Sequence, residues 1–433
     1  MTRRSALGGS TLLLVAVLVF AANLRGPLAA LGPVVGEVAT ELALSPAAVG
    51  LLTGLPVLCF ALAAPLASGL VARAGVGWAV TGALVVIVAG TVLRSAAGFT
   101  AALAGTLLIG VAITIGNIAV PVVVRRDFPL AIAGVTGAYT AAMNLGAMAT
   151  TALTAPLASA LGWRRGLAAW GLLALAALAL WLVAAVVRRK ARALPPPGTP
   201  SAPGSPSAVS TASTSVADSA PGSGSAPGAA PAPASPDARD GPAPPVLRRP
   251  FVWLLAGVFG MQSFGYYGMT AWLPELLGDV LVLDQAGAGG AAAPFQAAAV
   301  ISALAVPVAL ARRVPARVVF LVLVGLWLAL PLGVLWAPAG WLVWVTSAGL
   351  AQGGLFTVVM AVVLQRAVSV ADARRTSAAV QTIGYLIAAS GPSVLGALRG
   401  TSGSWLAPNL LLVTGFCLAA VAGAIAMRTP VKT

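Results

Sequence analysis

The chain has 433 residues, of which 59% are hydrophobic and 8% are charged, and its formal net charge is +15. A water-soluble domain has about 25% charged residues, so a chain this apolar could not keep its apolar surface away from water. It has no histidine, which excludes His-ligated zinc and haem sites and Ser-His-Asp hydrolases, and we predict an all-α polytopic membrane protein.

Apolar runs long enough to span a bilayer recur between clusters of charged and turn residues. We predict twelve spans, at residues 11–36, 47–71, 77–96, 99–124, 131–160, 165–187, 250–277, 291–311, 316–336, 339–365, 374–398 and 404–427. The first run follows Arg3 and Arg4 as a signal peptide would. It continues past Arg25 without a convincing cleavage site, so we interpret it as a retained span. Cys59 and Cys417 lie in apolar runs and are expected to be unpaired and buried.

The connectors between these spans alternate in charge. One set carries most of the arginines, and the positive-inside rule assigns it, with both termini, to the cytoplasm. The opposite set carries Glu37, Glu41, Glu275, Asp279, Asp284 and a few arginines that include Arg94. The positive net charge is therefore explained by the excess of arginines in the cytoplasmic connectors. We therefore expect a multi-pass protein of the cell membrane that contacts the lipid bilayer and a small-molecule substrate, binds no nucleic acid and is a monomer.

A Pro/Ala/Ser/Gly-rich tract separates the sixth and seventh spans. Because it has no apolar periodicity with which to build a core, we predict a disordered cytoplasmic linker at residues 188–249. It divides the chain into an N-terminal six-helix bundle at 1–187 and a C-terminal six-helix bundle at 250–433. The halves share a layout, since Asp127 and Tyr139 follow span four as Asp372 and Tyr385 follow span ten. Two parallel six-helix repeats are the architecture of the major facilitator superfamily.

Three segments resemble the cyanate/nitroimidazole porter family of that superfamily. They are "NLRGPLAALGPVVGEV" in the first span, "GMQSFGYYGMTAWLPELL" in the seventh and "AAVQTIGYLIAASGPSVLGAL" in the eleventh. The resemblance covers both halves and skips the linker. It implies twelve transmembrane helices in two pseudo-symmetric six-helix bundles, with alternating access to a site between them. Members of the family are linked to small anions such as cyanate and to small polar heteroaromatics.

Arg25 lies in the middle of the first apolar run, where a charge costs roughly 2.5–3.5 kcal/mol on insertion scales. No predicted span has an Asp or Glu in its interior, and Glu37 is ~18 Å away along a helix. A cation without a protein anion in a cavity suits an anionic or strongly polar ligand, held by bidentate hydrogen bonds. The alternative is that carbonyls, water or amides satisfy Arg25 and that it only pins two helices.

Few other polar residues lie inside the predicted spans, and they fall on spans that line the cavity in the superfamily. With Arg25, we expect the following to bind substrate: Asn23, Asn117, Tyr139, Asn144, Gln262, Tyr266, Tyr267, Trp272, Gln352, Gln381 and Tyr385. Amides donate and accept hydrogen bonds and tyrosines add a ring with a polar tip, which suits a small polar or flat solute. The alternatives are helix–helix hydrogen bonding for each amide and an interfacial anchor for Trp272.

The sequence therefore predicts a secondary active or facilitative transporter of a small polar, anionic solute, with Arg25 as the substrate-binding cation. An exporter of amphiphilic drug-like compounds would fit the composition but would not explain Arg25. A lipid-acting membrane enzyme would need an acid/base or metal constellation at one depth, and we find none. We accordingly expect no enzyme activity, catalytic residue, metal or cofactor. A non-transporting membrane receptor is the remaining alternative.

Overall fold

A computed structural model describes residues 2–96, 98–193 and 245–427, and these residues form helices and short turns without a β-strand. Residues 194–244 of the predicted linker lie outside the described residues. On either side of them, α10 ends at Ala193 and the described chain resumes at Pro245.

Each predicted span coincides with a helix or with a broken helix. The first half contains α1 (Thr2–Ala22), α2 (Gly26–Ala29), η1 (Gly32–Val34), α3 (Val35–Glu41), α4 (Pro46–Leu62), α5 (Ala64–Ala74), α6 (Val76–Arg94), α7 (Phe99–Asp127), α8 (Ile132–Leu161), α9 (Trp163–Ala169) and α10 (Gly171–Ala193). The second half contains η2 (Val246–Arg248), α11 (Pro250–Leu281), α12 (Gln285–Ala311), α13 (Ala316–Trp336), η3 (Pro338–Gly340), α14 (Trp341–Arg366), α15 (Val370–Ala389), α16 (Gly391–Ser402) and α17 (Leu406–Ala426).

Within the described residues, nine helical segments are long and apolar enough to cross a membrane, and the pair α4–α5, bent by 60°, makes a tenth. The helices α8 and α11 are 30 and 32 residues long but are not among them. These two helices contribute many of the polar residues described below.

Prolines explain the breaks in three spans. The first span is interrupted after Ala22, and α2 restarts with Pro27 in its first turn. Pro65 lies in the first turn of α5 after the bend, and Pro392 lies in the first turn of α16 after α15. Proline has no N–H and its ring clashes with the preceding turn, so it interrupts the helix. Among the described residues, only the α4–α5 break bends a span by more than 40°.

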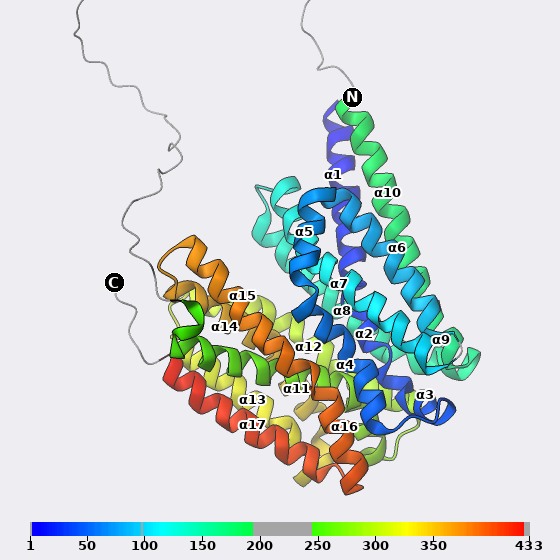
Figure 1. Cartoon of the computed structure of the whole chain (residues 1–433), viewed down its shortest axis with the longest axis vertical. Helices are drawn as coiled ribbons and strands as arrows, with labels where there is room; N and C mark the ends of the chain where they lie inside the picture. Colours follow the sequence, from blue (N-terminus) through cyan, green and yellow to red (C-terminus); the bar gives the residue numbers. More distant parts are fainter. Residues whose placement is uncertain (1, 97, 194–244, 428–433) are drawn as a thin grey trace, which may run out of the picture.

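The helices form two bundles that meet at one end and diverge at the other (Figure 1). Two main clusters of buried apolar residues correspond to them, one drawn mostly from residues 13–184 and the other mostly from residues 252–426. Where the bundles meet, glycines allow backbones to touch: a Cβ on Gly54 would lie 2.3 Å from the oxygen of Ala389, and one on Gly289 would lie 2.8 Å from that of Thr151.

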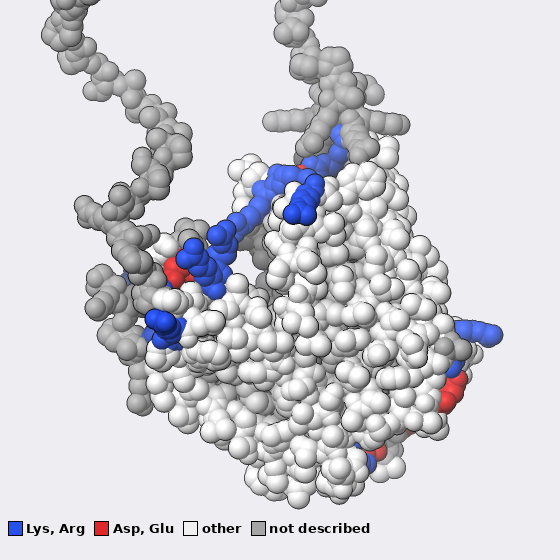
Figure 2. Space-filling view, in the orientation of Figure 1, with Lys and Arg blue, Asp and Glu red and all other residues white. Residues whose placement is uncertain are grey.

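At the opposite end, α5 and α15 stand apart on either side of the opening (Figure 1). Arg73 lies in the last turn of α5, Arg126 in that of α7 and Arg366 in that of α14, and Figure 2 shows basic side chains gathered around this end. Two sequence expectations are wrong. Cys417 is exposed on the surface rather than buried, and Arg94 is 2% exposed inside the fold rather than in a connector.

Candidate binding site in the central cavity

A cavity of about 810 Å³ lies between the two bundles, and helices from both halves line it. Ten of the twelve residues expected to bind substrate are on its wall: Arg25, Asn117, Tyr139, Asn144, Gln262, Tyr266, Tyr267, Gln352, Gln381 and Tyr385. They come from the break in the first span and from α7, α8, α11, α14 and α15. Polar residues scattered over some 360 positions therefore line one cavity.

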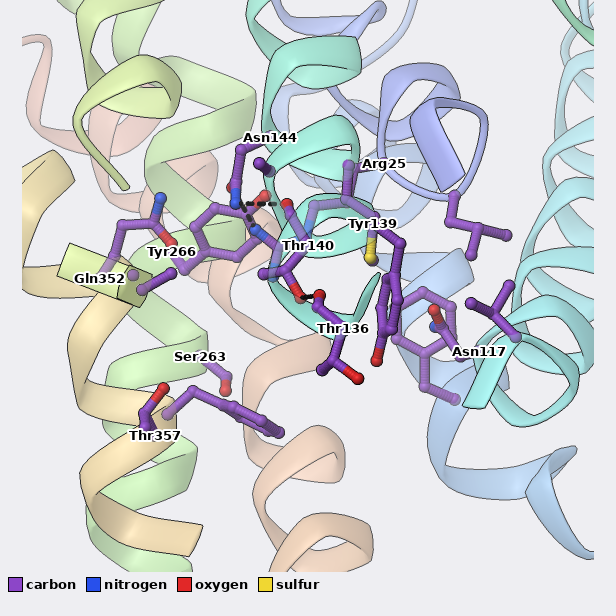
Figure 3. A pocket seen from close by; sticks show the side chains of 18 of the residues that line it. Arg25, Asn117, Thr136, Tyr139, Thr140, Asn144, Ser263, Tyr266, Gln352 and Thr357 are labelled. Carbon is purple, nitrogen blue, oxygen red and sulfur yellow. Dashed lines mark hydrogen bonds between the residues drawn. The ribbon is translucent and has the colours of Figure 1, made fainter. Parts of the chain in front are cut away.

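Arg25 projects into this cavity from the turn between α1 and α2 (Figure 3). Its Nη1 donates to Oδ1 of Asn144 at 2.7 Å, and Nδ2 of Asn144 donates to the oxygen of Thr140 at 3.0 Å. The second bond orients the amide so that its oxygen faces the guanidinium. The Arg25 guanidinium also lies 5.1 Å from the ring centroid of Tyr266, within cation–π range.

No carboxylate in the described part of the chain pairs with Arg25. A guanidinium has five N–H donors in a planar fork, and the contacts with Asn144 and Tyr266 use only part of this set. The side chain is half-buried and lines the cavity, so a solute in the cavity can reach it. The arrangement can receive an anion or the negative end of a polar group by charge-assisted hydrogen bonds.

The break that exposes Arg25 is held from two sides. Ala22 and Gly146 approach so closely that a Cβ on Gly146 would lie 2.3 Å from the oxygen of Ala22. From α6, Nη1 of Arg94 donates to the oxygen of Pro27 at 2.6 Å, while its Nε and Nη2 have no hydrogen-bond partner among the described residues. Arg94 therefore anchors the segment directly after Arg25, a role that its place in the sequence did not indicate.

Aromatic rings from both bundles form one wall of the cavity. Tyr266 and Tyr267 meet edge to face with centroids 4.8 Å apart, and Tyr385 packs against Phe259 at 5.2 Å. Phe60, from the first bundle, meets Tyr385 at 5.6 Å. Phe60 and Phe259 were not expected at the site, because a phenylalanine in an apolar span has the pattern of an ordinary core residue.

Hydroxyl groups complete the polar surface and were also missed. Thr136, Thr140, Ser263 and Thr357 line the cavity (Figure 3). The Thr140 hydroxyl donates to the oxygen of Thr136 at 2.9 Å, a bond within one helix. Such bonds let Ser and Thr lie in apolar helices at little cost, so their presence in a span carries little functional signal.

Two residues expected at the site lie elsewhere. Nδ2 of Asn23 donates to the oxygen of Val19 at 2.8 Å and to that of Leu173 on α10 at 3.4 Å, and Asn23 does not line the cavity. Nε1 of Trp272 donates to the oxygen of Pro392 at 2.8 Å, and its ring packs near Trp405 within the second bundle. Both side chains join secondary-structure elements within one bundle.

A family model described as Major Facilitator Superfamily matches residues 11–392. The chain is 30% identical to the uncharacterized transporter YycB of Bacillus subtilis, over 95% of this chain and 92% of that one. It is 28% identical to the 2-nitroimidazole transporter of Escherichia coli, over 99% of both chains. It is 27% identical to the cyanate transport protein CynX of the same organism, over 91% of both chains.

Solved structures show the same fold. A bacterial homologue of the human lysosomal transporter Spinster, in an inward-facing and unoccupied conformation, superposes with a TM-score of 0.69 at 16% identity and 97% coverage of both chains. A D-xylose-proton symporter superposes with a TM-score of 0.67 at 12% identity, over 97% of this chain and 98% of that one.

Proposed function

Because the chain belongs to the major facilitator superfamily and is a multi-pass membrane transporter rather than an enzyme, we propose that it carries a small polar, anionic solute that binds to Arg25. The superfamily fold has twelve transmembrane helices in two bundles, as the sequence pattern predicted. Relatives named as cyanate and nitroimidazole transporters agree with the resemblance found in the first, seventh and eleventh spans.

One observation carries the proposal: the half-buried Arg25 guanidinium in the central cavity, oriented by Asn144 and paired with no carboxylate of the described chain. A charge in this position is costly unless it is compensated, and a bound anion would compensate it. The aromatic wall around Tyr266 and Tyr385 supplies flat apolar faces beside that charge. A small planar or linear solute with a negative or strongly polar end matches both features.

The proposed transport follows alternating access. In the described conformation the bundles touch at Gly50 and Gly54 and diverge at the end where basic residues gather (Figure 2). If that end is cytoplasmic, as the positive-inside rule assigns it, this conformation faces inward. Both termini and the linker at 188–249 then lie in the cytoplasm, and rocking of the 1–187 bundle against the 250–433 bundle exposes Arg25 to the other side.

The test is equilibrium binding of cyanate and of 2-nitroimidazole to the purified protein. An ionic hydrogen bond contributes about 1.5–3 kcal/mol, so Arg25→Met should weaken binding by roughly 10- to 150-fold. Arg25→Lys should also bind poorly, because a point charge does not reproduce the planar two-pronged donor. Arg312→Gln is the matched control, since it removes an exposed arginine away from the cavity. Unchanged binding in a monodisperse Arg25→Met variant would refute the role of Arg25.

A further inference from the structure

A second cavity, of about 300 Å³, lies on the outside of the first bundle. It runs between α6 and α10, which pack side by side with α1 next to them (Figure 1), and it shares no lining residue with the central cavity. Leu13 and Trp181 are buried in its wall, whereas Trp78 is 69% exposed and Val186 is 52% exposed at its rim. The groove is thus apolar and open to the surroundings of the bundle, which in a transporter are lipid.

Two arginines lie at one end of this groove, one in the last turn of α7 and one on α10. Arg126 and Arg188 both line it, and both are paired with Asp127, whose side chain is 3% exposed. Together the three side chains carry one net positive charge. Asp127 occupies Nε and Nη2 of Arg126 and Nη2 of Arg188. Nη1 of Arg126 and Nε and Nη1 of Arg188 have no hydrogen bond to the rest of the described chain.

We propose that this groove is a binding site for an anionic glycerophospholipid. The lipid phosphate accepts hydrogen bonds from the free donors of Arg126 and Arg188, and one acyl chain lies along the apolar wall between α6 and α10. Asp127 holds both guanidinium groups in place and leaves one net positive charge for the phosphate. Arginine forks suit phosphate oxygens, and basic pockets between helices at the cytoplasmic surface attract anionic headgroups.

The length of the groove along α10 matches a lipid that lies in one leaflet of the bilayer. Trp181 and Arg188 are seven residues apart on α10, about 10 Å along the helix axis. The hydrocarbon half-thickness of a bilayer is about 15 Å, so the groove spans the outer part of a leaflet with its basic end toward the headgroups. The exposed Trp78 is of the residue type enriched at this depth. The proposal is independent of what the central cavity binds.

The test measures lipid binding to delipidated, purified protein by native mass spectrometry and by thermal stabilisation. Phosphatidylglycerol and phosphatidylcholine with identical acyl chains are compared, so that only the headgroup charge differs. The wild-type protein should bind and be stabilised by phosphatidylglycerol preferentially. Equal binding of both lipids would overturn the proposal.

Two variants locate the site. Gly77 lines the groove, and a Cβ at this position would have open space around it, so Gly77→Leu places a side chain in the groove from an unobstructed position. Gly82→Leu is its control, because Gly82 is also unobstructed on the same helix but outside the groove. Arg126→Gln removes one basic residue and should lower the affinity for phosphatidylglycerol about fivefold. Arg188 remains to pair with Asp127. If Gly77→Leu and Arg126→Gln bind phosphatidylglycerol as well as Gly82→Leu does, the groove is not the site.

Discussion

Gly50→Ala should shift the protein away from the conformation in which α4 and α16 touch. A Cβ on Gly50 would lie 2.2 Å from Cα of Ser393 and 2.7 Å from the carbonyl carbon of Pro392. Ordinary contact begins at 3.4 Å, whereas the methyl carbon would lie 2.2 Å from Cα of Ser393. The two helices must therefore move apart by about 1.2 Å to accept it. The opposing atoms belong to the backbone, so no change of rotamer relieves the clash.

The cost can be estimated from over-packing of a tight contact, which is typically about 1–3 kcal/mol. At 1.4 kcal/mol per tenfold, the population of this conformation relative to one in which the two helices have separated falls roughly 5- to 140-fold. Separation of the two helices relieves this contact, and alanine favours the helix by up to about 1 kcal/mol over glycine. The substitution therefore penalises one conformation selectively rather than the folded state as a whole.

The assay is a distance measurement between spin labels in a background that lacks Cys59 and Cys417. Labels at Ala72 on α5 and Ala378 on α15, both exposed, report on the open end of the molecule. Gly50→Ala should raise the population of short distances, because this end closes as the other end opens.

Gly82→Ala is the matched control, since its methyl group also meets nothing within 4 Å and lies on α6, away from the contact between the bundles. A folded Gly50→Ala variant with the same distance distribution as Gly82→Ala would refute the reasoning. It would show that the glycine contact does not distinguish between two conformations of the bundles.

Three further predictions concern the site, the topology and the coupling. Arg94→Met should weaken cyanate and 2-nitroimidazole binding several-fold, because the oxygen of Pro27 loses its hydrogen-bond donor. The melting temperature should change little, because an apolar residue replaces a buried charge that has no carboxylate partner in the described chain. Unchanged affinity would show that Arg94 is a packing residue only. A cysteine at Ser213 should react with a membrane-impermeant reagent only in inverted vesicles, and labelling in intact cells would contradict the assigned topology. In liposomes, a pH gradient should not drive a solute that does not ionise between pH 5.5 and 8, because no predicted span interior offers an Asp, Glu or His; uphill transport that Glu275→Gln abolishes would prove otherwise.

The sequence was sufficient for the fold because membrane insertion is decided locally. Each span is a run of apolar residues whose length must match the bilayer, and its transfer free energy depends on little beyond its own composition. The same reasoning identified Arg25 and nine other residues of the cavity wall, since a polar group inside a span is costly unless a cavity or a partner receives it.

What the sequence could not decide is which way each helix faces. Asn23 and Asn144 are the same residue type in similar apolar surroundings, yet Asn23 donates to backbone oxygens of α1 and α10 while Asn144 holds Arg25 from 119 positions away. Arg94 was expected in a connector and instead supports the break after Arg25. These outcomes depend on the rotation and close packing of helices from distant parts of the chain, which hydropathy does not encode. Only the tertiary structure shows them, because non-local contacts determine which polar atoms meet.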